Sequence, residues 1–124
     1  MHPVVVHGGG KSISKALRNE DIHSEFLHGL RITDSNSIKV VERVLNNEVN
    51  PHMVDILREF DGKARGIHGE DIFLAEKMTG RDSSTNESCD WGFVGSINSV
   101  DVEPIDAYMK SEIVPVITPL AQDT

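Results

Sequence analysis

The chain has 124 residues, a formal net charge of −8 and a sequence pI near 5.1. This length allows one domain built around one hydrophobic core. The acidic charge argues against a nucleic-acid partner, because such binding depends on Lys and Arg side chains that neutralise phosphates. The apolar runs are as long as strands and too short to cross a membrane.

The first predicted element is the apolar run Val4–Val6. Three β-branched residues in succession predict a short strand that is buried on both faces. The run leads into three glycines, Gly8–Gly10, and the following residues, Lys11–Glu20, carry apolar side chains at helical spacing. The chain is therefore expected to open with a strand, a glycine turn and a helix.

The next segment, residues 24–33, mixes apolar and polar residues around Gly29 and predicts a short hairpin or flap. Asp34 then provides a helix N-cap signal, since its short polar side chain can accept from free backbone N–H groups. A second helix is expected to start at Asn50-Pro51, with Asn as the cap and Pro in the first turn, and to end at Gly62.

The second half of the chain alternates strands with a helix. A strand is predicted at Lys63–Ile67, and a hairpin from Ile72–Met78 and Trp91–Ile97, with the polar residues 79–90 between them as a flexible surface loop. A last helix begins at Glu103-Pro104, and a final buried strand follows at residues 113–118. This order predicts an α/β fold, a three-layer αβα sandwich with a mainly parallel sheet.

The glycine turn is the strongest candidate for a binding site. A strand that passes through Gly8, Gly9 and Gly10 into a helix exposes backbone N–H groups and directs a helix N-terminus at the same space, which favours a carboxylate or phosphate. A turn that is glycine-rich for steric reasons alone is the alternative. Neither the P-loop nor the dinucleotide-binding pattern fits, because Val5 and Ile13 stand where those patterns need glycine.

Arg31 is the second candidate, and it follows Gly29 and Leu30 in the predicted flap. Its planar guanidinium can pair with a carboxylate through two parallel hydrogen bonds, which a lysine cannot do. A solvated arginine is the alternative for this residue taken alone.

Seven segments that cover nearly the whole chain stand in a recognisable order: residues 4–11, 26–34, 62–67, 69–71, 91–95, 100–105 and 113–117. In this order they resemble the acetylglutamate kinases of the amino acid kinase family. The Gly-Leu-Arg segment separates that group from carbamate, aspartate and uridylate kinases better than the glycine turn does.

This resemblance implies phosphoryl transfer from ATP, with Mg²⁺, to the side-chain carboxylate of N-acetyl-L-glutamate, an early step of arginine biosynthesis. It implies that Gly8 and Gly9 donate N–H groups to that carboxylate and to the transferring phosphoryl group, and that Arg31 binds the α-carboxylate. The remaining implied phosphate or lid contacts are Gly10, Gly29 and Leu30.

The same resemblance implies that both catalytic lysines of the family lie outside this sequence, one before Met1 and one after Thr124. No catalytic residue is therefore assigned, and residues 1–124 are expected to form a partial kinase domain, the acyl-substrate-binding half, that is inactive alone. Missing strands would leave open sheet edges, so a homo-oligomer is expected, with a domain-swapped arrangement or a marginally stable monomer as alternatives. The helical stripe Ile38, Val41 and Leu45 is a candidate for either the dimer face or the core.

A non-catalytic dicarboxylate-binding or interaction module with the same fold is the alternative to an enzyme. Cys89 is the only cysteine, so no disulfide forms within the chain and a cytoplasmic location is expected. The six histidines have no ligand-like spacing, so no metal site is predicted and they are expected at the surface or in loops. Glu70 and Asp71 are expected to be solvated turn residues, and Trp91 is expected to pack in the hairpin.

Overall fold

The computed structural model describes residues 2–60, 62–81 and 88–124. Within these ranges no helix is long and apolar enough to span a membrane. In chain order the elements are β1 (Val5–Val6), α1 (Gly10–Asn19), β2 (Phe26–Leu27), β3 (Leu30–Arg31), α2 (Ser35–Val44), a π-helical turn (Leu45–Val49), α3 (Asn50–Glu59), β4 (Ala64–Ile67), a 3₁₀ turn (Gly69–Asp71), β5 (Phe73–Arg81), β6 (Ser88–Val100), α4 (Glu103–Lys110), β7 (Val114–Ile117) and β8 (Gln122–Asp123).

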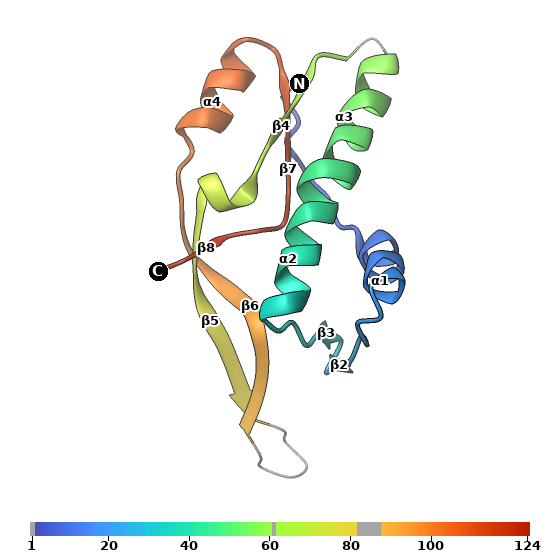
Figure 1. The fold of residues 1–124 in the computed structure, drawn as a ribbon. Coiled ribbons are helices and arrows are strands. Elements are labelled where there is room, and N and C mark those ends of the chain that lie inside the picture. The colour runs from blue at the N-terminus through green and yellow to red at the C-terminus, as the bar shows by residue number, and fades with distance from the viewer. Residues whose placement is uncertain (1, 61, 82–87) are drawn as a thin grey trace.

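A parallel sheet of three strands, in the order β1-β7-β4, forms the centre of the fold. Its two faces are covered by different helices (Figure 1). Val116 on β7 packs in a cluster with Val54 of α3, whereas the next residue, Ile117, packs near Ile105 of α4. Successive side chains of the central strand β7 therefore point to opposite faces of the sheet and contribute to the core on each face. The predicted α/β sandwich with a parallel sheet is confirmed.

The expected burial of Val4–Val6 on both faces is wrong. β1 is an edge strand that pairs with β7 alone, and Val6 keeps 58% of its surface exposed. An apolar run can be recognised from its sequence as a strand, but the number of its neighbours depends on the rest of the sheet.

The predicted break between two helices at Asn50-Pro51 is also wrong, because α2, the π-helical turn and α3 form one continuous rod (Figure 1). Asn50 has helical angles of φ −62° and ψ −50°, and its side chain is buried. A proline inside an α-helix clashes with the carbonyl group four residues earlier, and a wider π-helical turn relieves such crowding. The turn Leu45–Val49 lies directly before Asn50-Pro51.

The hairpin prediction is confirmed, since β5 and β6 pair in antiparallel orientation. Both strands reach further than expected: Thr79–Arg81 and Ser88–Asp90 are paired strand residues and not loop, and Cys89 is buried among them. Residues 82–87 of the predicted loop lie outside the described residues. β8, which was not predicted, adds to β5 in parallel.

Two residues of the predicted apolar stripe belong to the core. Leu45, in the π-helical turn, is 2% exposed and packs with the α1 residues Ile13 and Leu17, and Val41 of α2 packs against the same cluster. This contact fixes α1, and therefore the glycine turn at its start, against the helical rod. The third residue of the stripe, Ile38, lines a cavity.

Asp34 caps α2 as predicted, and its carboxylate makes the stability of the fold depend on pH. One oxygen, Oδ1, accepts hydrogen bonds from the backbone N–H groups of Ser37 at 2.7 Å and Asn36 at 3.1 Å. These hydrogen bonds lower the pKa of the Asp34 carboxyl, and the one from Ser37 has the larger effect. The stabilisation from a carboxyl with a lowered folded-state pKa is present above its unfolded-state pKa and is lost as pH falls through its folded-state pKa.

We predict that Asp34→Asn, which keeps an acceptor but removes the charge, lowers the free energy of unfolding at neutral pH. The difference from wild type should shrink as pH falls through the lowered pKa of Asp34. Urea unfolding followed by circular dichroism across this pH range tests the expectation, with Asp55→Asn on the exposed side of α3 as the charge-matched control. A difference that stays constant with pH would contradict the capping role.

Candidate functional site

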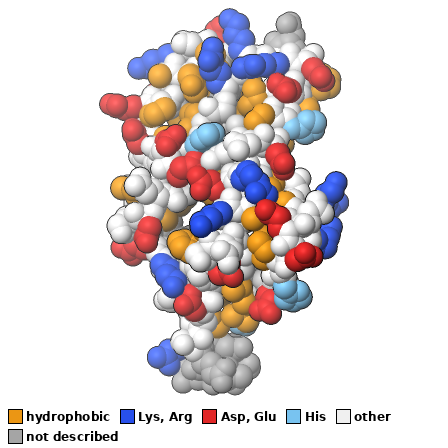
Figure 2. Space-filling model, viewed as in Figure 1, with side chains coloured by type: hydrophobic (Ala, Val, Ile, Leu, Met, Phe, Trp, Pro, Cys, Tyr) orange, Lys and Arg blue, Asp and Glu red, His pale blue; other side chains and the backbone are white. Residues whose placement is uncertain are grey.

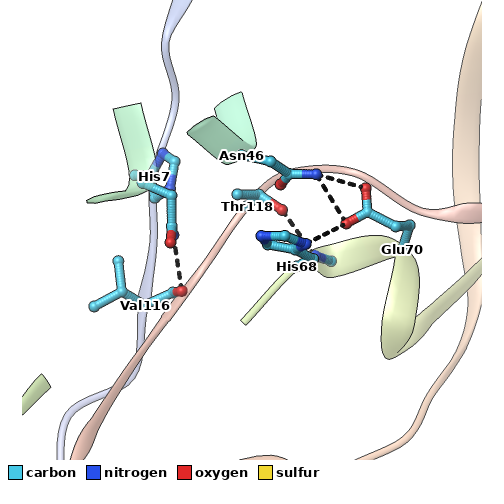
Figure 3. Close-up of polar contacts among 8 residues, drawn as sticks. His7, Asn46, His68, Glu70, Val116 and Thr118 are labelled. Atoms are coloured by element: carbon cyan, nitrogen blue, oxygen red, sulfur yellow. Dashed lines mark hydrogen bonds and ion pairs between the residues drawn. The ribbon is translucent and has the colours of Figure 1, made fainter. Parts of the chain in front are cut away.

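The three parallel strands all end at one edge of the sheet, and polar residues follow each of them. His7 comes directly after β1, His68 after β4 and Thr118 after β7. Figure 3 shows these residues gathered at this edge. In open α/β sheets ligands bind beyond the carboxyl ends of the strands, so a binding site is expected at this edge.

The glycine turn leaves β1 at this edge and presents unpaired backbone donors. Within the described part of the chain, the N–H groups of Gly8 and Gly9 donate to no protein acceptor. Gly10 is the first residue of α1, where helix N–H groups have no partner within the helix. A β-carbon added at Gly8 or Gly10 would meet nothing within 4 Å, whereas one at Gly9 would lie 2.8 Å from Leu45 Cδ2. The turn is open on its outer side and packed against the π-helical turn at Gly9.

Arg31 lies against the same first turn of α1. Its Nη2 group donates to Ser14 Oγ at 3.0 Å and to the Gly10 carbonyl oxygen at 3.4 Å, and Nη1 donates to Ser24 Oγ at 2.8 Å. The guanidinium carbon also lies 4.7 Å from the centre of the Phe26 ring. The structure therefore brings together Arg31 and the end of the glycine turn. The contacts of Ser14 and Ser24 were not predicted, although the spacing of Ser14, four residues after Gly10, places it one helical turn away.

The positive charge of Arg31 has no anionic partner in residues 2–60, 62–81 and 88–124, since no carboxylate there lies within ion-pair distance. Partial burial lowers the pKa of the guanidinium, because it removes some of the water around the charge. The charge also lies beside the N-terminus of α1, the positive end of the helix dipole. Two positive features placed together, with unpaired donors next to them, favour an anion between them.

The flap that carries Arg31 is a tight hairpin of β2 and β3. His28 and Gly29 have φ values of 52° and 79°, as a two-residue hairpin turn of type I′ requires. Leu30 follows this turn and is half-buried, and no atom lies within 4 Å of a β-carbon built on Gly29. The hairpin turn therefore fixes the backbone from which the Arg31 side chain extends.

Trp91 fixes the flap to the β5–β6 hairpin. Its Nε1–H donates to the carbonyl oxygen of Leu27 at 2.8 Å, and the backbone of Thr33 exchanges hydrogen bonds with Trp91 and Phe93, both at 2.8 Å. Trp91 is 6% exposed, so the predicted packing is confirmed, but the ring also connects two hairpins. Sequence spacing gave no signal for this link, because 64 residues separate the partners.

Glu70 is not the solvated turn residue that was expected. Asn46 Nδ2 donates to both of its carboxylate oxygens, at 3.2 and 3.1 Å, and His68 Nδ1 lies 3.7 Å from Oε1 (Figure 3). Next to it, the Gly69 N–H donates to Thr118 Oγ1 at 2.8 Å. This group therefore ties the ends of β4 and β7 to the helical rod.

Two cavities, of about 420 and 380 Å³, border Glu70 and Asp71 on the side of β8. Neither of these two is lined by the glycine turn or by Arg31. Gly8 and Gly10 are exposed, so the candidate site lies at the surface, at the start of α1. On the face drawn in Figure 2, acidic side chains spread over the middle of the molecule, while Lys and Arg gather at the end where α3 ends and β4 begins.

Comparison with known proteins gives a consistent result. The profile of the amino acid kinase family matches residues 1–124. Acetylglutamate kinase from Akkermansia muciniphila is 38% identical over 122 residues, which are 98% of this chain and 41% of that enzyme. Acetylglutamate kinase from Geobacter sulfurreducens is 40% identical over 125 residues, or 97% of this chain and 43% of that enzyme. The chain therefore spans about two-fifths of the length of these relatives.

Two solved structures share the fold. The protein smu.665 from Streptococcus mutans superposes with a TM-score of 0.83 at 21% identity, over 98% of this chain and 47% of that chain. N-acetylglutamate synthase from Neisseria gonorrhoeae, complexed with coenzyme A and N-acetyl-glutamate, superposes with a TM-score of 0.72 at 17% identity, over 99% of this chain and 27% of that chain. At these identities the likeness concerns the fold alone.

We predict that Trp91→Phe loosens the flap, because it keeps an aromatic ring but removes the donor to Leu27. The free energy of unfolding should fall by about 1–3 kcal/mol, from the lost hydrogen bond and the smaller ring. The amide of Ile32, which donates to Glu25 at 2.9 Å, should exchange its hydrogen faster. Hydrogen exchange measured by mass spectrometry checks this, and Phe93→Leu at an exposed neighbour is the control. Unchanged exchange at Ile32 in Trp91→Phe would show that the flap does not depend on this bond.

Proposed function

This chain belongs to the amino acid kinase family, and on that premise we propose that it forms part of an acetylglutamate kinase. This transferase of arginine biosynthesis would move the terminal phosphoryl group of ATP to the side-chain carboxylate of N-acetyl-L-glutamate. The observation that carries the proposal is the position of the Arg31 guanidinium, 3.4 Å from the carbonyl oxygen of Gly10 at the end of the glycine turn. Identities of 36% to 42% with acetylglutamate kinases support the choice of substrate.

A dicarboxylate suits this surface because it has two anionic ends. In our assignment the free N–H groups of Gly8 and Gly9 bind the side-chain carboxylate, which becomes the acceptor of the phosphoryl group. Arg31 binds the α-carboxylate, and of its five N–H donors only three are used in hydrogen bonds within the described residues. Backbone donors that are fixed before the reaction stabilise charge that develops on the transferring group.

The flap completes the proposed site. Gly29 and Leu30 would lie over the acetylated substrate as a lid, and Gly10, at the start of α1, would add a further N–H group toward the phosphoryl group. Ser14 and Ser24 hold the guanidinium from two different segments, which supports a fixed direction for Arg31 before the substrate arrives.

ATP supplies the phosphoryl group in this proposal and Mg²⁺ accompanies it. Across the described residues, no group of three or more His, Cys, Asp or Glu side chains is arranged to hold a metal ion. Apart from the contacts that the glycine turn is proposed to make with the phosphoryl group, we assign neither the ion nor ATP to residues of this chain. We also propose that the protein is cytoplasmic and forms a homo-oligomer. The oligomer is supported by β1 and β4, which are the edge strands of the parallel sheet and offer backbone groups for pairing.

We predict that Arg31→Ala weakens binding of N-acetyl-L-glutamate by about 10- to 100-fold, as expected for the loss of charge-assisted hydrogen bonds. Isothermal titration calorimetry on the chain measures the affinity, and circular dichroism verifies that the variant is folded. Arg18→Ala, in the exposed last turn of α1, removes the same charge and should bind as wild type does.

N-acetyl-L-glutamine serves as a second ligand, because it has the α-carboxylate but lacks the side-chain carboxylate that the glycine turn is assigned to bind. It should bind more weakly than N-acetyl-L-glutamate. Equal affinity of Arg31→Ala and Arg18→Ala would remove Arg31 from the site, and the absence of any difference between the two ligands would remove the glycine turn.

A further inference from the structure

His7, which was expected at the surface or in a loop, lies in a loop but is buried, with 8% exposure. It is the residue between β1 and the glycine turn. Its Nδ1 lies 2.8 Å from the carbonyl oxygen of Gly8, and its Nε2 lies 3.0 Å from Nδ2 of Asn50. Asn50 Nδ2 also donates to the carbonyl oxygen of Val116 at 2.9 Å. These contacts form a hydrogen-bond chain, Val116–Asn50–His7–Gly8, that runs from the central strand to the turn.

The chemistry of the groups fixes the direction of every hydrogen bond in this chain. The amide nitrogen of Asn50 has two N–H groups and accepts nothing, so one N–H goes to Val116 and the other to His7 Nε2. The reverse orientation of the amide would place its oxygen against the carbonyl oxygen of Val116, with two acceptors facing each other. Nε2 must therefore accept, which leaves the proton of the neutral ring on Nδ1, where it is donated to the Gly8 carbonyl.

We propose that His7 is a positioning residue that sets the direction of the Gly9 N–H group. The peptide between Gly8 and Gly9 is planar and trans, so its N–H points away from its C=O. Because the His7 ring binds this C=O from the interior, the Gly9 N–H points away from the ring and remains free for a ligand. Three successive glycines leave the turn with great conformational freedom, and the His7 hydrogen bond limits it.

The surroundings of Asn50 support this reading. Asn50 is 4% exposed, and its side chain extends from the helical rod toward the sheet, where Gly66 of β4 faces it. A β-carbon at Gly66 would overlap Asn50 Oδ1. The absence of a side chain at Gly66 thus makes room for the amide that orients His7. The inference rests on the proposed function only for the identity of the ligand.

Two substitutions separate a positioning role from a merely structural one. His7→Asn can place an amide N–H near the position of Nδ1 and keep the donor to Gly8, whereas the longer side chain of His7→Gln places its amide near Nε2 and loses that donor. Both variants should be less stable than wild type. Only His7→Gln should lose affinity for N-acetyl-L-glutamate, by about 10-fold, while His7→Asn stays within about 3-fold of wild type. Equal losses in both variants, or no loss in His7→Gln, would overturn the proposal.

Nuclear magnetic resonance on the ligand-free chain tests the same inference without any substrate. The ring nitrogens of His7 should report a protonated Nδ1 and an unprotonated Nε2, and the opposite tautomer would overturn it. Residual dipolar couplings of the Gly9 N–H should agree between wild type and His7→Asn and differ in His7→Gln, and unchanged couplings in His7→Gln would also overturn it. If these tests succeed but wild type binds no N-acetyl-L-glutamate, the proposed function fails while the role of His7 stands.

Discussion

The parallel pairing of β7 between β1 and β4 is the constraint on which the rest of the structure depends. It joins segments that are more than 100 residues apart in the chain, since Val5 lies opposite Val116, and Gly66 lies on the other side of the same residue. Because all three strands run in the same direction, their carboxyl ends bring the glycine turn, the 3₁₀ turn and Thr118 to one edge. This pairing therefore sets the position of the glycine turn relative to the 3₁₀ turn and Thr118.

On this scaffold, the site combines groups that disfavour one another when no ligand is bound. A guanidinium that burial has partly desolvated lies beside the positive end of a helix dipole, and the neighbouring amides of Gly8 and Gly9 have no protein acceptor. Ser14, Ser24 and the Phe26 ring nevertheless hold Arg31 in place. An anion at this surface would offset the positive charge and accept hydrogen bonds from the free amides.

The features that the sequence predicted well are those that local chemistry determines. The Asp34 cap, the turn at Gly29 and the β5–β6 hairpin depend on residues close together in the chain. Asn50 misled the prediction because a local helix-start signal was overridden by a tertiary role, and its amide binds Val116, 66 residues away. The burial of His7 and the engagement of Glu70 depend likewise on partners from distant segments.

The π-helical turn at Leu45–Val49 affects the directions in which the apolar sides of α2 and α3 face. A wider turn accommodates one more residue than an α-helical turn, and one residue corresponds to a rotation of roughly 100° about the helix axis. The apolar side of α3 is thereby placed out of phase with that of α2. Val40 and Val44 can face α1 while Val54 faces the sheet, although no loop separates them. Because of this one rotation about the helix axis, a single continuous helical rod contributes side chains to two different hydrophobic cores.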